Sequence, residues 1–112
     1  MFNEKYSHER RFNYDSSKNE FIDLVDYINN TGNNSFVVRG MFTYNSKFGK
    51  RPCIVTDGYN VNVPNHINND VKSIMSNDAE VAAVNAGKCG FRVKHYQDKN
   101  GVDRLSGSFY DL

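Results

Sequence analysis

The chain has 112 residues, of which 38% are hydrophobic and 24% are charged, as in a single globular domain. No apolar run approaches the roughly 20 residues needed to cross a bilayer, and residues 1–11 lack the apolar segment of a secretory signal. We therefore expect a cytoplasmic protein with no membrane contact. The net charge of +1 argues against the broad affinity for polyanions of a histone-like protein.

The charges are distributed unevenly along the chain. Residues 35–64 and 88–112, which carry the strand-like patterns described below, hold nine Lys or Arg against four Asp or Glu. The other residues hold five against nine, so an excess of five positive charges and an excess of four negative charges give the net +1. The strand-forming part is electropositive, which favours an anionic ligand there.

The N-terminal third is predicted to be an arm followed by one helix. Residues 1–16 mix charges and aromatic rings without a clear period. A capping-box pattern begins at Ser17, and Gly32 supplies a stop signal. Between them, apolar residues recur at helical spacing: Phe21, Leu24, Val25 and Ile28. We expect a short amphipathic helix over residues 18–30, and we treat residues 1–34 as an extension of a domain at 35–112.

Three strand-like segments follow, at residues 34–44, 53–57 and 59–63. Gly40 interrupts the first segment as a bulge or a bend would. In the third segment apolar and polar residues alternate strictly. This alternation predicts that Tyr59, Val61 and Val63 are buried and that Asn60 and Asn62 face outward.

A helical linker separates the third predicted strand from the fourth. Apolar residues from Ile67 to Met75 recur at helical spacing, and a second helix begins near Asn77 and ends at Gly87. Residues 91–96 alternate again as a strand. A hairpin turn at residues 98–101 then leads into a last strand from about residue 103 to 112.

This order of elements is that of the OB-fold, whose strand 2–3 face and neighbouring loops receive oligonucleotides or oligosaccharides. We expect a mainly β, α+β domain. It would be a five-stranded OB-like antiparallel barrel with a helix between strands 3 and 4 and an N-terminal helix. Other small α+β domains with a curled antiparallel sheet share the same order of elements, and they stay open as an alternative.

Three segments resemble small OB-type single-stranded DNA-binding proteins of Gram-positive bacterial phages and mobile elements. They are Ser46-Lys47-Phe48-Gly49, Tyr59-Asn60-Val61-Asn62-Val63-Pro64-Asn65-His66 and Asn85-Ala86-Gly87-Lys88-Cys89-Gly90-Phe91. The resemblance covers about residues 35 to 112 and rests on pattern more than on a diagnostic motif. It implies a role in the replication or recombination of a mobile element.

The tip between the first two predicted strands is the strongest candidate for ligand binding. From Ser35 to Thr56 the sequence contains no carboxylate and four cations: Arg39, Lys47, Lys50 and Arg51. At such a tip Phe48 gains no core burial but could stack on a base, which contributes about 1–3 kcal/mol. The alternative is that Phe48 covers the barrel mouth while the cations keep the tip soluble.

The fourth predicted strand offers a second candidate surface. Its face opposite Phe91 and Val93 presents Arg92, Lys94 and Tyr96, which pairs two phosphate contacts with one stacking ring. An ordinary solvated strand face explains the same pattern equally well. The complete candidate set adds further side chains expected on the same concave surface: Tyr44, Asn60, Asn62 and Arg104.

These residues predict a protein that binds single-stranded DNA with low sequence specificity, the choice between DNA and RNA staying open. We expect no cofactor, no metal and no catalytic activity, because the sequence has no phosphate-binding glycine loop and no metal-ligand spacing among its three histidines and two cysteines. Cys53 and Cys89 are interpreted as small buried hydrophobes. The rival hypothesis is a phage-encoded interaction module that inhibits a host enzyme. Self-pairing or docking would then use the N-terminal helix or an edge strand.

Overall fold

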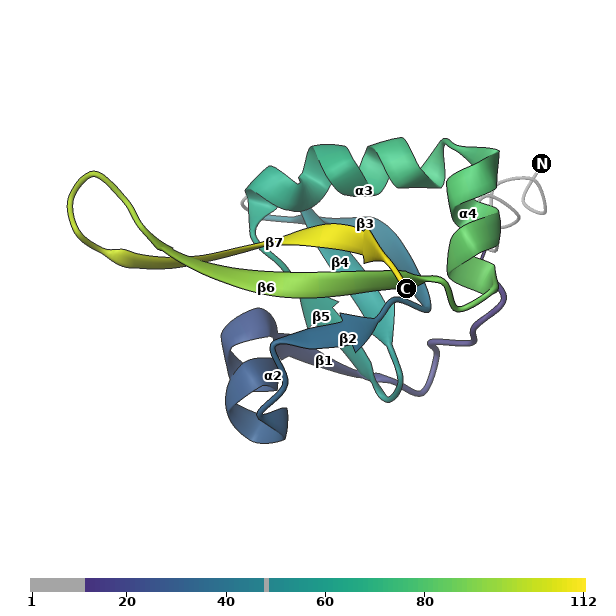
Figure 1. The fold of residues 1–112 in the computed structure, drawn as a ribbon, viewed down its shortest axis with the longest axis horizontal. Coiled ribbons are helices and arrows are strands. Elements are labelled where there is room, and N and C mark those ends of the chain that lie inside the picture. The colour runs from purple at the N-terminus through teal and green to yellow at the C-terminus, as the bar shows by residue number, and fades with distance from the viewer. Residues whose placement is uncertain (1–11, 48) are drawn as a thin grey trace.

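Two β-sheets of four and three strands, with helices packed beside them, make up the fold (Figure 1). The computed structural model describes residues 12–47 and 49–112. Sheet A has the strand order β1-β5-β4-β3, and sheet B has the order β2-β6-β7. The strands are β1 Glu20–Asp23, β2 Ser35–Val37, β3 Gly40–Ser46, β4 Gly49–Thr56, β5 Tyr59–Asn62, β6 Cys89–Gln97 and β7 Asp103–Asp111. The helices are α2 Leu24–Thr31, the short 3-10 helix η1 Asn65–Ile67, α3 Asn68–Met75 and α4 Asp78–Asn85.

The segment from Ser35 to Ser46 passes from one sheet to the other. The Val38 N–H donates to the Cys89 carbonyl in sheet B at 2.9 Å, and the next N–H, of Arg39, donates to the Val55 carbonyl in sheet A at 2.7 Å. The single strand predicted at 34–44 is therefore split into β2 and β3. The break lies beside Gly40, where the sequence predicts a bend.

The predicted helix at 18–30 is wrong in its first part. Residues 20–23 form β1, which pairs in parallel with β5, and the helix begins only at Leu24. The apolar residues of this segment fit the period of a helix and also that of a strand. The edge of β5 has backbone N–H and C=O groups that need hydrogen-bond partners. A strand at residues 20–23 supplies those partners, whereas a helical turn there would not. The end of the helix is confirmed, because Gly32 takes a positive φ of 71° and its N–H caps the Ile28 carbonyl.

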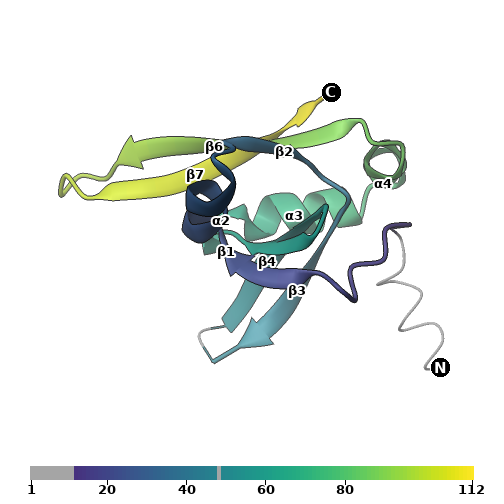
Figure 2. The ribbon, with the colours of Figure 1, turned by 90° about the horizontal axis from the view of Figure 1, so that it is seen from below.

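The hydrophobic core lies between the two sheets, which appear as separate layers in Figure 2. Residues from both sheets and from α2, α3 and α4 enter it: Leu24, Tyr27, Phe36, Val38, Met41, Ile54, Val61, Val63, Val71, Ile74, Val84, Phe91 and Val93. Because neighbouring strand residues point to opposite sides, the alternate positions on each sheet face away from this core. Those two outward faces hold the candidate binding residues.

The strands do not close into a barrel. β1 pairs with the edge of β5, and β7 has β6 as its strand neighbour, so residues 12–47 and 49–112 contain no closed ring of strands. The α+β class is confirmed, and so are the helices α3 and α4 between the third and fourth predicted strands. None of the helices in these ranges is long and apolar enough to cross a membrane.

Candidate nucleic-acid interface

The outward side of sheet B gathers basic, aromatic and hydroxyl side chains. Residues opposite each other in an antiparallel pair share a face. The register therefore places one set of side chains together, which we call the sheet B face: Ser35, Arg92, Lys94, Tyr96, Arg104, Ser106, Ser108 and Tyr110. Phe91 and Val93 alternate with these residues and enter the core. Four of the predicted site residues thus meet on one surface: Arg92, Lys94, Tyr96 and Arg104.

Arg92 is held over an aromatic ring on the sheet B face. Its guanidinium carbon lies 4.5 Å from the centre of the Tyr110 ring, a cation–π contact worth about 0.5–1 kcal/mol at an exposed site. The Tyr110 ring in turn covers Gly90, where a Cβ atom would lie 2.6 Å from the ring Cζ. Gly90 therefore allows Tyr110 to lie flat against β6 and to hold the Arg92 side chain in place.

The charge of Arg104 is partly compensated. Its Nε lies 3.1 Å from the Asp98 carboxylate, which also accepts the N–H groups of Asn100 and Val102 at 2.8 and 3.1 Å. The Val102 N–H, the Arg104 side chain and the Asn100 N–H lower the pKa of Asp98 from its ordinary value of 3.8. No such ion pair is found for Arg92 or Lys94 among the described residues. These two cations are the sheet B charges most available to an anion.

Three other candidates meet on the outward side of sheet A. Tyr44 and Arg51 are directly opposite each other on β3 and β4, and the Tyr44 hydroxyl donates to Asn62 Oδ1 on β5 at 2.9 Å. Asn62 Nδ2 donates to the Asp23 carboxylate at 3.2 Å. Lys47 and Lys50 belong to the same β3–β4 hairpin, whereas Phe48 lies outside the described residues. The candidates are therefore divided between two sheets and do not form one concave surface.

Arg39 and Asn60 have structural partners. Arg39 lies where the chain passes between the sheets, and its Nε is 3.2 Å from the Asp57 carboxylate. Asn60 points away from the core, as its alternation predicts, but it is only 3% exposed, so the expected solvent-facing position is wrong. The Asn19 amide covers it and donates to its Oδ1 at 3.2 Å. A local period shows on which side of a sheet a residue lies but not whether another segment covers that side.

Three aromatic residues on these surfaces are not among the predicted site residues: Phe21, Phe42 and Tyr110. Phe21 was assigned to a helix, and on β1 its ring is 62% exposed and lies 6.2 Å from Phe42 and 6.4 Å from Tyr44. Phe42 was treated only as part of a strand. Tyr110 follows Arg104 at even spacing on the last predicted strand, so alternation places these two side chains on the same side of that strand.

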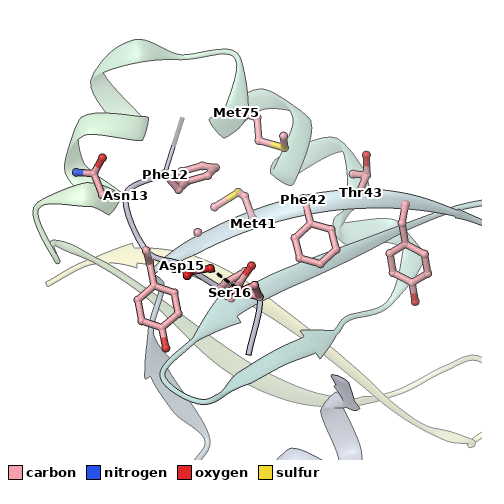
Figure 3. A pocket seen from close by; sticks show the side chains of 13 residues that line it. Phe12, Asn13, Asp15, Ser16, Met41, Phe42, Thr43 and Met75 are labelled. Atoms are coloured by element: carbon pink, nitrogen blue, oxygen red, sulfur yellow. Dashed lines mark hydrogen bonds between the residues drawn. The ribbon is translucent and has the colours of Figure 1, made fainter. Parts of the chain in front are cut away.

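A groove of about 1040 Å³ lies beside β3 (Figure 3). Residues 12–17 form one wall, and Met41, Phe42 and Met75 line other parts of it. Phe12 packs on Gly40, where a Cβ would lie 3.1 Å from the Phe12 Cβ. Asp15 also lies in this groove, which makes it less suited to a phosphate than the sheet B face.

The described residues show no arrangement suited to metal or thiol chemistry. Within residues 12–47 and 49–112, no three His, Cys, Asp or Glu side chains gather as metal ligands would. Cys53 and Cys89 are free, the first buried and the second half-buried. Burial raises the pKa of Cys53 to about 12 and that of Cys89 to about 11, with Asp111 and Glu80 adding to the rise at Cys89. Both thiols therefore stay protonated at neutral pH and are poor nucleophiles.

Comparison of the chain with protein-family models, with curated proteins and with solved structures gives no match.

Proposed function

We propose that the protein binds single-stranded nucleic acid through the sheet B face, with little preference for base sequence. The supporting observation is the strand register. It places Arg92, Lys94 and Arg104 beside Tyr96 and Tyr110 on one outward side. Among the described strands of sheet B, no carboxylate shares this side, because Asp103 and Asp111 occupy the alternate positions. Cations with interleaved rings suit a phosphate backbone whose bases are free to stack.

The side chains divide into two roles. Arg92 and Lys94 contact phosphates, and Arg104 adds a third positive charge near the β6–β7 turn. Tyr96 is 45% exposed and offers a ring to a base. Stacking accepts every base because each has a π face, so this surface binds without reading sequence. No cofactor takes part in the proposed binding.

We further infer that the fold is an OB-like arrangement that is open between β5 and β7. The meander β3-β4-β5, the β6-β7 hairpin and the intervening helices follow the expected order, and the segment 35–46 pairs with both β4 and β6. The strand 2–3 face of an OB-fold corresponds here to the outward side of β4 and β5. Residues 12–19 cover part of that side, which favours sheet B as the main surface. Together with the resemblance to phage proteins, this supports a role in replication or recombination.

The test is fluorescence anisotropy with labelled oligo(dT) of about 20 nucleotides, which exceeds the roughly 4–16 nucleotides that one OB-fold covers. Three phosphate contacts give a salt slope of about −2 for a single strand, so affinity should fall about 20-fold between about 50 and 200 mM salt. Oligo(rU) measured in parallel gives the preference between DNA and RNA. The absence of binding at the lower salt concentration would overturn the proposal.

A matched pair of charge reversals distinguishes binding at the sheet B face from a general effect of net charge. Lys94→Glu alters the sheet B face, and Lys72→Glu makes the same charge change at an exposed position of α3. Lys94→Glu should weaken binding about tenfold and reduce the salt slope, whereas Lys72→Glu should change affinity less than about twofold. Equal losses in the two variants would rule out the sheet B face as the binding surface.

Docking on a protein is a second candidate, because apolar side chains are exposed on the acidic N-terminal elements. Phe21 on β1 is 62% exposed and Val25 on α2 is 50% exposed, close to Glu20, Asp23 and Asp26. The α2 part of this surface, with Val25 and Asp26, has the wrong charge for a nucleic acid and would suit a basic patch on a partner. The oligonucleotide titration distinguishes the two functions, since docking on a protein predicts no dependence on Lys94.

A further inference from the structure

Three aromatic rings form a separate cluster on the outward side of sheet A. Phe21 from β1 lies 6.2 Å from Phe42 and 6.4 Å from Tyr44, and the two β3 rings are 6.3 Å apart. Phe21 is 62% exposed. We call these residues the aromatic cluster.

Hydrogen bonds fix one ring of the aromatic cluster. The Tyr44 hydroxyl donates to Asn62 Oδ1 at 2.9 Å, and Asn62 Nδ2 donates to the Asp23 carboxylate at 3.2 Å. This chain of contacts links β3, β5 and β1. A ring held in this way loses little conformational entropy when a flat ligand stacks on or beside it.

Positive charge lies next to the aromatic cluster. Arg51 is directly opposite Tyr44 on the same side of the sheet, whereas Lys50, the preceding residue of β4, has its side chain on the other side. The Arg51 Nε is buried without a hydrogen-bond partner, and no ion pair to Arg51 is present in the described part of the chain. Residues 35–56 contain no carboxylate. Two carboxylates lie near the aromatic cluster: the Asn62 amide binds Asp23, and Asp15 lines the groove that Phe42 and Tyr44 also line. Rings beside uncompensated cations are the features that single-stranded nucleic acid recognises.

The aromatic cluster and the sheet B face point in opposite directions. Met41, Ile54 and Val61 of sheet A and Phe91 and Val93 of sheet B meet in the shared core. The alternate side chains of each sheet therefore lie on the side away from the core, with Ser106 of the sheet B face also 2.6 Å from His66 Nε2 in η1, and Figure 2 shows the two sheets as separate layers. A short oligonucleotide on one face does not reach the other.

From this geometry we propose that the aromatic cluster, with Arg51, is a second binding site for single-stranded nucleic acid. One protein molecule then bridges two strands, or two distant segments of one strand. The inference rests on the proposed function of the sheet B face and adds bridging to it. A protein that holds two strands at once brings them together for pairing without contacting their base sequence.

The experiment counts oligonucleotides per chain and detects their proximity. Oligo(dT) of about eight nucleotides, within the roughly 4–16 nucleotides that one OB-fold covers, is labelled with donor or acceptor dye. Saturating titration should give two oligonucleotides per wild-type chain, and a mixture of the two labels should show energy transfer. Analytical ultracentrifugation of the same samples establishes that the complex contains a single chain.

Matched variants identify the second site. Phe21→Ala should reduce the stoichiometry from two to one and abolish energy transfer while leaving the remaining affinity unchanged. Val25→Ala, at an exposed apolar position of α2, should behave as wild type. Arg51→Glu should lower the stoichiometry as Phe21→Ala does, with Lys50→Glu, on the other side of β4, as its control.

The two proposals fail in different ways. Binding of one oligonucleotide per chain that depends on Lys94 but not on Phe21 or Arg51 overturns the bridging inference and keeps the sheet B function. Energy transfer that occurs only in a two-chain complex also overturns it. If no oligonucleotide binds, the proposed function itself fails.

Discussion

At Gly107 the β7 backbone passes so close to the Phe91 ring that a side chain has no room. A Cβ atom at this position would lie 2.3 Å from Phe91 Cζ and 2.8 Å from the backbone oxygen of Arg92. Phe91 is completely buried, so neither the ring nor the strand can move aside easily. The close contact brings β7 over the core while Ser106 and Ser108 keep their positions on the sheet B face.

Gly107→Ala should therefore destabilise the fold by about 1–3 kcal/mol through overpacking. Urea denaturation followed by circular dichroism measures the change. Ser108→Ala is the matched control, because Ser108 lies next in β7 with its side chain on the other side, and it should stay within about 0.5 kcal/mol of wild type. An equal stability of the two variants would mean that β7 shifts freely.

Asp98 makes the β6–β7 turn sensitive to acid. The N–H of Val102, the Arg104 side chain and the N–H of Asn100 favour the carboxylate and lower its pKa below 3.8. A group whose pKa is lower in the folded state stabilises that state above its unfolded pKa. This stabilisation disappears as the pH falls through the lowered folded-state pKa.

The amide NMR signals of Asn100 and Val102 should therefore titrate with a midpoint below 3.8, and the turn should loosen only below that midpoint. Asp98→Asn should abolish this titration. A midpoint at or above 3.8 would contradict the hydrogen bonds assigned to Asp98.

At the level of elements, one side chain attaches the N-terminal segment to sheet A. The Asn19 amide donates to the Thr56 carbonyl at 2.9 Å, to the Tyr59 carbonyl at 3.2 Å and to Asn60 Oδ1 at 3.2 Å. These acceptors flank the β4–β5 turn. Asn19 immediately precedes β1, so its contacts set the position at which β1 begins to pair with β5.

Asn19→Ala should cost about 1–3 kcal/mol, because it leaves the buried Asn60 oxygen without its donor. Thermal and urea unfolding measure the loss. Asn29→Ala on the exposed side of α2 makes the same substitution without breaking such contacts and should stay within about 0.5 kcal/mol. Equal stability of Asn19→Ala and Asn29→Ala would mean that water replaces the hydrogen bonds of the Asn19 amide without loss of stability.

The elements with strong local signals could be predicted from the sequence. The alternation in β6, the turn at residues 98–101 and the cap at Asn77, whose side chain accepts the Glu80 N–H, agree with the structure. β1 could not be predicted in this way, because its strand partner β5 lies about 40 residues further along the chain. The same limit applies to the site. Alternation predicts that Arg92 and Lys94 share a face, but only the long-range register shows that Tyr110 lies beside them.

At the level of the whole molecule, the β6–β7 hairpin extends well beyond the core (Figure 1). Residues from Lys94 to Gln97 are all exposed, whereas Phe91 and Val93 are buried. The hairpin tip therefore has backbone hydrogen bonds but few apolar contacts, and such regions open at low free energy.

Hydrogen exchange should reveal this difference as a gradient along β6. Amides near Phe91 should exchange only through global unfolding, and those near Tyr96 should exchange much faster. Oligo(dT) binding should slow exchange at the tip if Tyr96 and Arg104 contact the ligand. Uniform protection along β6 in the free protein would contradict the exposure of its outer half.

The passage of residues 35–46 between the sheets has a consequence for how the chain folds. Phe36 pairs with Phe91, 55 positions further along, and this contact secures β2 to sheet B. Closing so long a loop costs entropy before any contact compensates for it, and pairings of this kind slow the folding of a domain. The β3-β4-β5 meander can form early from nearby residues. Sheet B becomes complete only when the C-terminal hairpin joins β2, so the hairpin that carries the proposed binding side chains is expected to dock on the rest of the fold late in folding.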